Sequence, residues 1–494
     1  MSAISTQHLN PTERAVLDAV PKDLYIAGRW RAAEGGARLA VEDPSTGEAL
    51  VEVADGTPED AMAALAAASE TQSSWAAQAP RERGEILRRA YEAMTGRADE
   101  LALLMTLEMG KPVAESKGEI AYSAEFLRWF SEEAVRIHGR YMINTTGQGR
   151  LLTMRQPVGP CVLVTPWNFP MAMGARKIAP AIAAGCTMVV KPAQQTPLSM
   201  LALAAILEQA GLPAGVLNIL TTSHAGAAVG PLLRDRRTRK LSFTGSTEVG
   251  ARLIEESAER VLRVSMELGG NAPFVVFEDA DLDAAVEGAM LAKMRNVGEA
   301  CTAANRFHVA APVAEEFAER LAARMSALKV GRGTEDGVDV GPLIDEAQRR
   351  KVDELVGEAR ERGAHVVTGG GPLDGRGYFF APTVLADVPT EARMAREEIF
   401  GPVAPVYTFS SEDEALAAAN RTEYGLVAYV YTRDLDRALR AAEGIEAGMV
   451  GLNQGLVSNP AAPFGGVKES GFGREGGFEG IGEYLETKYV AVAT

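Results

Sequence analysis

An alternation of short apolar runs with helical stretches begins at Gly159 and limits the possible folds more than any other feature of the sequence. Apolar runs that read as buried strands alternate with helix-forming stretches, such as the one at 198–211, which we expect Thr196 and Pro197 to open. Strands that are joined through helices run parallel and form a sheet with helices on both faces. The runs are CVLVTP (161–166), MVVKP (188–192), GVLNIL (215–220) and RKLSFTG (239–245). We therefore predict an α/β fold with a doubly wound sheet.

A second alternating set follows and predicts a second α/β domain that begins near residue 268. A chain of 494 residues is too long for a single hydrophobic core. The set runs from APFVVF (272–277) through helical patterns at 281–297 and 312–328 to HVVTGG (365–370) and GMVGLN (448–453). The first 57 residues contain only short β-like pieces, after which Thr57 and Pro58 open a run of helices that continues within 81–109 and 113–137.

Charge, cysteines and the N-terminal segment exclude several classes of protein. With 66 acidic and 50 basic residues the net charge is −16, which disfavours nucleic acid and anionic membranes as partners. The three cysteines lie far apart without metal spacing, and the five histidines form no pair at ligand spacing, so we expect reduced thiols and no metal. Residues 1–20 contain no signal-like apolar run and include acidic residues, so we expect a cytoplasmic protein without a membrane span.

Two glycine-containing segments are candidates for binding a dinucleotide. Gly471–Gly476 matches the spacing GxGxxG, but no strand precedes it and only 18 residues follow, so we interpret it as a tight loop. SFTGSTEVG (242–250) is the better candidate, because a strand there leads through Gly245 into a helix whose N-terminus can hold a phosphate. Taken alone, the second segment fits a plain strand–helix turn equally well. Lys191 also lies at the carboxyl end of a predicted parallel strand, where such sheets bind ligands.

Five further segments carry distinctive residues in a fixed order. They are TPWNFP (165–170), MELGGNAP (266–273), KMRNVGEACTAANR (293–306), EEIFGPV (397–403) and PFGGVKESGFGRE (463–475). Together with the segments above, they resemble the aldehyde dehydrogenase superfamily over nearly the whole chain, and within it most closely the succinate-semialdehyde dehydrogenases. The resemblance implies the oxidation of succinate semialdehyde to succinate with NADP or NAD.

The resemblance assigns three catalytic residues. Cys301 is the nucleophile, which forms a thiohemiacetal and then a thioester, and its polar surroundings are unusual for a packed thiol. Asn168 and the backbone N–H of Cys301 hold the oxyanion, although this asparagine taken alone would more often be part of an Asn–Phe–Pro turn. Glu267 activates the water that hydrolyses the thioester, and its alternative is a plain strand-end carboxylate. Cys161 and Cys186 lie in apolar runs and are expected to pack in the core.

The resemblance also assigns contacts to the cofactor. Gln194 stands where many relatives that prefer NAD have glutamate, so the charge that would repel a 2′-phosphate is absent, and Lys191 lies nearby to pair with that phosphate. We therefore expect NADP to be accepted and preferred over NAD. The residues assigned to the cofactor are Trp167, Lys191, Gln194, Gly245, Ser246, Glu398 and Phe400.

Three residues match those that hold the substrate carboxylate in succinate-semialdehyde dehydrogenases. They are Arg176, Arg295 and Ser458, which come from three separate segments. A single arginine is more often part of a structural ion pair, but two arginines and a hydroxyl together favour an anion site, which a chain of charge −16 needs in order to attract an anionic substrate.

The family has a small β element for oligomerisation, and here 141–159 reads as a hairpin and 488–494 as a final strand. Such edge strands need covering, so we expect a homodimer or homotetramer. The implied division is 1–140 and 160–267 for cofactor binding, 268–470 for catalysis, and 141–159 with 471–494 for oligomerisation.

Two positions depart from the family pattern. Glu299 stands where many relatives have glutamine, and an acidic side chain facing Cys301 would disfavour its thiolate. Ala303 replaces a second cysteine, which excludes a local disulfide. Three alternatives remain open. The substrate could be glutarate semialdehyde or another aldehyde, Cys301 with a distant histidine could form a cysteine hydrolase or acyltransferase, or the chain could be an inactive binding protein.

Overall fold

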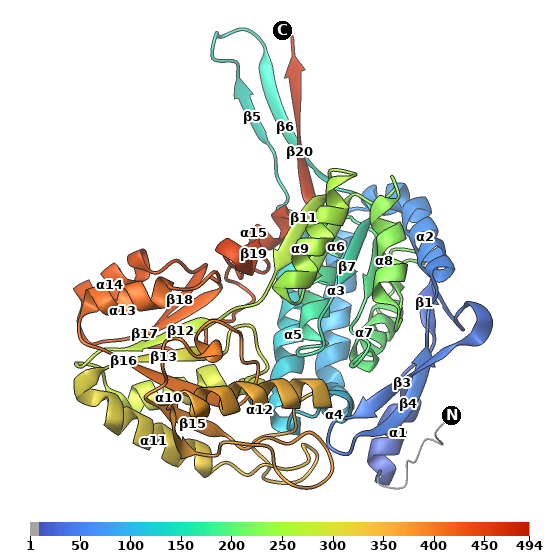
Figure 1. Ribbon diagram of the computed structural model, residues 1–494. Coiled ribbons are helices and arrows are strands. Elements are labelled where there is room, and N and C mark those ends of the chain that lie inside the picture. The colour runs from blue at the N-terminus through green and yellow to red at the C-terminus, as the bar shows by residue number, and fades with distance from the viewer. Residues whose placement is uncertain (1–8, 494) are drawn as a thin grey trace.

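The computed structural model describes residues 9–493, so residues 1–8, on which part of the signal-sequence prediction rests, lie outside it. Two α/β bodies lie side by side, and a three-stranded arm projects from them with the C-terminus near its tip (Figure 1). None of the described helices is long and apolar enough to cross a membrane.

The first body is built on an eight-stranded sheet in the order β19-β11-β10-β7-β8-β9-β1-β2. Its five central strands are parallel, and they are β7 (Cys161–Val164), β8 (Met188–Lys191), β9 (Leu217–Ile219), β10 (Lys240–Thr244) and β11 (Arg263–Glu267). Antiparallel strands close both sides, namely β1 (Leu24–Ile26), β2 (Arg29–Arg31) and β19 (Gly471–Phe472). The predicted parallel sheet is confirmed.

Both faces of this sheet are buried against helices, and this explains why its strands are continuous apolar runs. Within β7, Cys161 and Leu163 pack on one face against α6 and α7, while Val162 and Val164 pack on the other face against α2, α8 and α9. The helices of this body are α2 (Pro58–Ala76), α3 (Pro80–Gly96), α4 (Ala98–Met109), α5 (Val113–Glu133), α6 (Ala172–Ala184), α7 (Leu198–Gln209), α8 (Ala225–Arg234) and α9 (Thr247–Ala258).

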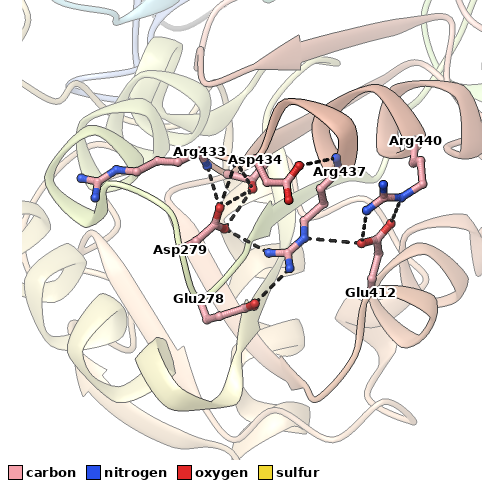
Figure 2. A network of polar contacts seen from close by, with 8 residues as sticks. Glu278, Asp279, Glu412, Arg433, Asp434, Arg437 and Arg440 are labelled. Carbon is pink, nitrogen blue, oxygen red and sulfur yellow. Dashed lines mark hydrogen bonds and ion pairs between the residues drawn. The ribbon is translucent and has the colours of Figure 1, made fainter.

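The second body has a seven-stranded sheet in the order β14-β15-β16-β13-β12-β17-β18, again with helices on both faces. Its strands are β12 (Ala272–Val276), β13 (Ala304–Ala310), β14 (His365–Thr368), β15 (Thr383–Ala386), β16 (Val403–Phe409), β17 (Val427–Tyr431) and β18 (Met449–Leu452). Its helices are α10 (Leu282–Met294), α11 (Ala314–Ser326), α12 (Glu346–Glu361), α13 (Glu412–Asn420) and α14 (Leu435–Gly444). A network of charged side chains around Arg437 joins α13 and α14 to the loop after β12 (Figure 2).

The arm consists of β5 (Arg140–Ile143), β6 (Arg150–Pro157) and β20 (Leu485–Val492), with β6 in the centre. The predicted hairpin and final strand are both present, and β20 pairs with β6 of its own chain.

The glycine motif at 471–476 does not form a nucleotide loop. Gly471, at φ 108°, begins β19 and lies so close to β11 that a Cβ atom would meet the Met266 carbonyl oxygen at 1.9 Å. The prediction of a tight loop is therefore only partly right, because Gly471–Phe472 form a strand and the chain turns at Gly473 and Gly476, which have positive φ angles. The remaining elements are β3 (Arg38–Asp43), β4 (Glu48–Ala54) and α15 (Glu479–Gly482).

The helix starts differ from the predictions in three places. Helix α1 (Pro11–Ala19) was not predicted, although Asn10 and Glu13 form a capping box that marks its start. The helical pattern at 81–109 is two helices that meet at Arg97. Thr196 does not cap α7, because its hydroxyl donates to the Trp167 carbonyl oxygen, and Glu108 of α4 accepts the first N–H groups of α7 instead.

Candidate active site

A cleft of about 240 Å³ lies between the two bodies, where the loops after β7 and β10 meet the segments before β13 and β16. This is the carboxyl edge of the first parallel sheet, where open α/β sheets bind ligands. Of the thirteen predicted site residues, ten line the cleft: Trp167, Asn168, Arg176, Gly245, Ser246, Arg295, Cys301, Glu398, Phe400 and Ser458.

Cys301 is the only one of the three cysteines that reaches the cleft, because Cys161 and Cys186 are fully buried in the first core as predicted. Burial raises the pKa of the Cys301 thiol to about 12, and Arg176 opposes this rise. The thiol therefore keeps its proton in the unliganded protein. Because nucleophilic attack needs the thiolate, a base or a cation supplied with the ligands must assist its deprotonation.

Glu299 does not face the nucleophile. Its side chain is fully buried, and Oε1 accepts a hydrogen bond of 3.1 Å from the Ile344 N–H. Burial raises the pKa of this carboxyl well above its ordinary value. The acids that raise the pKa of Cys301 are Glu398 and Glu267 instead. The predicted repulsion between Glu299 and a Cys301 thiolate is therefore not supported by the geometry.

Asn168 lies in the loop between β7 and α6 and is held from several directions. Its Nδ2 donates to the Glu299 carbonyl oxygen at 3.0 Å. The backbone carbonyl oxygen of Asn168 accepts hydrogen bonds from Lys111 Nζ at 2.8 Å and from Asn296 Nδ2 at 3.0 Å. Since an amide nitrogen has two protons, the second proton of Asn168 Nδ2 is left for a ligand in the cleft.

Glu267, at the end of β11, is buried behind the cleft lining, and neither of its carboxyl oxygens has a hydrogen-bond partner within the described chain. Burial and the neighbouring Glu475 raise its pKa well above the ordinary value, against the opposing effect of Arg176 and Lys177. A carboxyl group of raised pKa beside a thiol has the properties of a general base that accepts a proton from water.

Glu475 was not among the predicted residues, yet it organises this region. It forms a buried ion pair with Arg176, and Lys177 Nζ donates to its Oε1 at 2.5 Å. The Arg176 guanidinium lies over the Phe464 ring at 4.1 Å, and its Nη2 has no hydrogen-bond partner among the described residues. Part of Arg176 is therefore satisfied by Glu475, and its Nη2 remains available for an anion.

Arg295 lies over the Phe169 ring at 4.7 Å, and its Nη1 donates to Ser458 Oγ at 3.5 Å. No ion pair links this arginine to a carboxylate in the part of the chain that the structure describes. The three residues predicted to hold a carboxylate thus line one end of the cleft together with Tyr122, Phe169 and Phe464. A small anionic molecule would find both charge and apolar walls there.

The other residues of the cleft form a surface suited to a nucleotide. Ser246 caps α9, whose N-terminus points its free N–H groups toward this region. The rings of Trp167 and Phe400 meet edge to face at 5.4 Å. Glu398 accepts a hydrogen bond from the Gly270 N–H at 3.2 Å, and burial raises its pKa to about 7.

Lys191 and Gln194 do not line the cleft. Lys191 ends β8 and is nearly buried, which lowers its pKa to about 8, while Gln194 is exposed just beyond it.

Sequence reasoning missed the apolar side chains at the end of the cleft that Arg176, Arg295 and Ser458 line. Phe464 belongs to a motif that was recognised, but Tyr122 lies in an ordinary helical pattern that carries no sign of a site.

None of the histidines that the structure describes lines the cleft, which leaves a Cys–His hydrolase without its base there. His8 lies outside the described residues. The structure also brings together no group of three potential metal ligands within residues 9–493.

Comparisons with known proteins agree with this geometry. The model of the aldehyde dehydrogenase family matches residues 30–490. A succinate-semialdehyde dehydrogenase of Paenarthrobacter nicotinovorans is 61% identical over 90% of this chain and 99% of that protein. A glutarate-semialdehyde dehydrogenase of Pseudomonas putida is 50% identical over 95% of this chain and 97% of that protein.

An NADP(+) succinate-semialdehyde dehydrogenase of Escherichia coli is 50% identical over 94% of this chain and 97% of that protein. The crystal structure of an NADP-dependent enzyme of E. coli superimposes with a TM-score of 0.95 at 49% identity, covering 97% of this chain and 99% of the other. A succinate-semialdehyde dehydrogenase structure from Burkholderia pseudomallei gives a TM-score of 0.95 at 48% identity, covering 98% of this chain and 99% of the other. The chain belongs to the aldehyde dehydrogenase family.

Proposed function

We propose that this protein oxidises succinate semialdehyde to succinate with NADP or NAD. The observation that carries the proposal is the position of a half-buried thiol, Cys301, in the same cleft as two arginines that come from different segments and converge with Ser458. An aldehyde with a carboxylate at its far end has the two features that this cleft recognises. The relatives named above that act on succinate semialdehyde support the same substrate.

The residues of the cleft have distinct roles in the proposed reaction. Cys301, once deprotonated, adds to the aldehyde carbon, and Asn168 Nδ2 with the backbone N–H of Cys301 stabilises the oxyanion. When bound, the nicotinamide cofactor supplies the hydride acceptor that turns the adduct into a thioester. Glu267 then takes a proton from the water that attacks the thioester, which releases the carboxylic acid and restores the thiol.

The cofactor surface supports a dinucleotide. A Cβ atom at Gly245 would meet the Phe243 ring at 2.4 Å, so any larger residue in the turn that leads into α9 would have to displace that ring. We propose that this turn and Ser246 hold the diphosphate, that Glu398 and Phe400 border the nicotinamide half, and that Trp167, Lys191 and Gln194 border the adenosine half.

The test of the substrate proposal is a comparison of two aldehydes. Replacement of Arg295 with alanine removes charge-assisted hydrogen bonds of roughly 1.5–3 kcal/mol, so kcat/KM for succinate semialdehyde should fall about ten- to a hundredfold. An uncharged aldehyde of similar length should lose far less. Equal losses for both aldehydes would mean that Arg295 is structural and that the substrate is not an anionic semialdehyde.

Arg176→Ala is the less clean variant, because it also leaves the buried Glu475 without its arginine partner. Glutarate semialdehyde is the second candidate substrate, favoured by the 50% identical relative of P. putida. A panel of semialdehydes of increasing length, each assayed with both cofactors, separates the two candidates through kcat/KM.

We further propose that the protein is a cytoplasmic homodimer or homotetramer. The three free cysteines fit a reducing compartment, and the exposed arm fits association of copies through β5 and its neighbours. We retain the proposed division into a cofactor-binding part (1–140 and 160–267), a catalytic part (268–470) and an oligomerisation part (141–159 and 471–494). Within the last part, β19 pairs with the first sheet before the chain reaches the arm.

A further inference from the structure

The segment that leads from α10 to Cys301 contains three consecutive residues in the left-handed backbone region, of which only the last is a glycine. Asn296 has φ 55° and Val297 has φ 53°, and together with Gly298 they lie in the 3-10 turn η3 (Arg295–Gly298). Asparagine tolerates this conformation better than most residues, whereas a β-branched valine is strained in it. Residues held in such conformations need support from their surroundings, and they gather at functional sites.

The side chain of Asn296 points back into this turn and joins the two halves of the proposed oxyanion site. Its Nδ2 donates to the Asn168 carbonyl oxygen at 3.0 Å and to the Glu299 carbonyl oxygen at 2.9 Å. Asn168 Nδ2 also donates to the Glu299 carbonyl oxygen, at 3.0 Å. One buried amide thus fixes the loop that carries Asn168 against the loop that carries the backbone N–H of Cys301.

Charged groups from α5 and from the loop that precedes it hold both loops in place. The N–H of Asn296 donates to both carboxyl oxygens of Glu115, at 3.0 and 3.2 Å. Lys111 Nζ donates to the Asn168 carbonyl oxygen and also to Glu119 Oε2, at 2.6 Å. Glu119 Oε1 in turn accepts the N–H groups of Met171 and Ala172, close to the start of α6.

We propose that Asn296 is a positioning residue for the oxyanion site and that it acts through Asn168 and the Glu299–Cys301 backbone. This rests on the proposed function, since it concerns the step in which Cys301 adds to an aldehyde. Oxyanion donors work because they are fixed before charge develops, so a small displacement of either donor weakens the transition state more than the bound substrate. Asn296 itself does not line the cleft and touches no reacting atom.

The variant Asn296→Gly tests this proposal cleanly. Glycine adopts φ 55° without strain, and its backbone N–H can still donate to Glu115, so the substitution removes only the side-chain amide. We expect the rate of the first turnover, measured by rapid mixing as formation of reduced cofactor, to fall about ten- to a hundredfold. KM for the aldehyde and binding of the cofactor should change less than about threefold.

Val297→Gly is the matched control. It places a glycine at the neighbouring left-handed position and leaves the Asn296 amide in place, so it reports on added loop flexibility alone. We expect it to keep at least about a third of the wild-type first-turnover rate. An equal loss in both variants would assign the effect to flexibility and overturn the role of the amide.

A double-mutant cycle shows whether Asn296 acts through Asn168. In the background of Asn168→Ala, the further change Asn296→Gly should slow the first turnover by a smaller factor than it does in the wild type, because one of the two donors that it orients is already gone. Full additivity of the two losses would overturn the proposal. A wild-type protein that reduces no cofactor with any aldehyde would refute the proposed function itself, an outcome distinct from the failure of either variant.

Discussion

The carboxyl group of Glu267 has no hydrogen-bond partner in the described chain, and a second acidic side chain, Glu475, lies nearby. Because burial and Glu475 raise its pKa while Arg176, Lys177 and Arg474 lower it, the proton leaves Glu267 only at a pH well above that of an ordinary glutamate. The rate of thioester hydrolysis should therefore rise with pH through this raised pKa, since only the ionised form accepts a proton from water.

Replacement of Glu267 with glutamine removes the base and keeps the shape of the side chain. The first hydride transfer should proceed, so rapid mixing should show a burst of reduced cofactor followed by a steady state at least about a hundredfold slower than in the wild type. The rise of kcat with pH should disappear as well. A uniform loss of rate without a burst would count against Glu267 as the base for hydrolysis.

We expect Gln194 to set the preference between the two cofactors, because it carries no charge. It is exposed beyond the end of β8, close in sequence to the nearly buried Lys191. A neutral side chain there leaves the 2′-phosphate of NADP unopposed, whereas Gln194→Glu should repel it and shift the ratio of kcat/KM values toward NAD by about tenfold. Steady-state assays with both cofactors measure the shift. A wild-type protein that strongly selects NAD would contradict this assignment.

The cleft residues that the sequence predicted lie in distinctive motifs. One residue that it missed contacts segments that are far away in the chain. Cys301, Asn168 and Arg295 were found because the segments around them are distinctive. Glu475 lies in the motif at 463–475, but its contact with Arg176 and Lys177 joins segments far apart in the chain. Neither segment contains a sequence signal that predicts the pairing. Buried ion pairs of this kind depend on the packing of α6 against the C-terminal segment.

Arg437 illustrates how charged side chains hold elements together at the scale of helices and loops. From α14 it reaches Glu278 at 3.1 Å, Asp279 at 3.0 Å and Glu412 at 3.4 Å (Figure 2). Its guanidinium also lies over the Phe277 ring at 4.6 Å. Its side chain is 19% exposed, so solvent weakens these contacts only in part.

We expect Arg437→Met to lower the free energy of unfolding of the second body by about 1–2 kcal/mol, because several contacts with carboxylates are lost at once. The neighbouring Arg433 is the control. Its side chain is 69% exposed and, among residues 9–493, forms an ion pair only with Asp281, so Arg433→Met should change stability by less than about 0.5 kcal/mol. Thermal unfolding midpoints, compared at one scan rate, measure both effects, and equal midpoints for the two variants would contradict this account.

Element identity was predictable where periodicity was strong, and element starts were not. The parallel strands of the first sheet were found because burial on both faces makes them continuous apolar runs. The start of α7 was misread, since Thr196 and Pro197 look like a cap, whereas Glu108 from a distant helix satisfies the first N–H groups. Local signals cannot reveal a cap that tertiary packing supplies.

The arm is the part of the whole molecule that a single chain leaves without a covering partner. Its outer strand β5 is exposed along its full length, with Tyr141 64%, Met142 48% and Ile143 55% exposed, and Tyr489 of β20 is 58% exposed. An unpaired edge strand that carries apolar side chains is prone to pair with another chain. Association with a second copy of this chain would cover both the strand edge and these side chains.

The double substitution Tyr141→Glu and Ile143→Glu tests this association, because the two side chains lie on the same face of β5 and charge would block apolar contact there. We expect light scattering after gel filtration to show a dimer or tetramer for the wild type and a monomer for the double variant. The two exposed side chains take little part in the contacts within one subunit, so the unfolding midpoint of a dissociated subunit should depend little on them. Leu291→Glu, at a side chain of α10 that is 50% exposed, is the control for an added charge and should keep the wild-type mass. A monomeric wild type, or a double variant that keeps its mass, would show that the arm does not join copies of the chain.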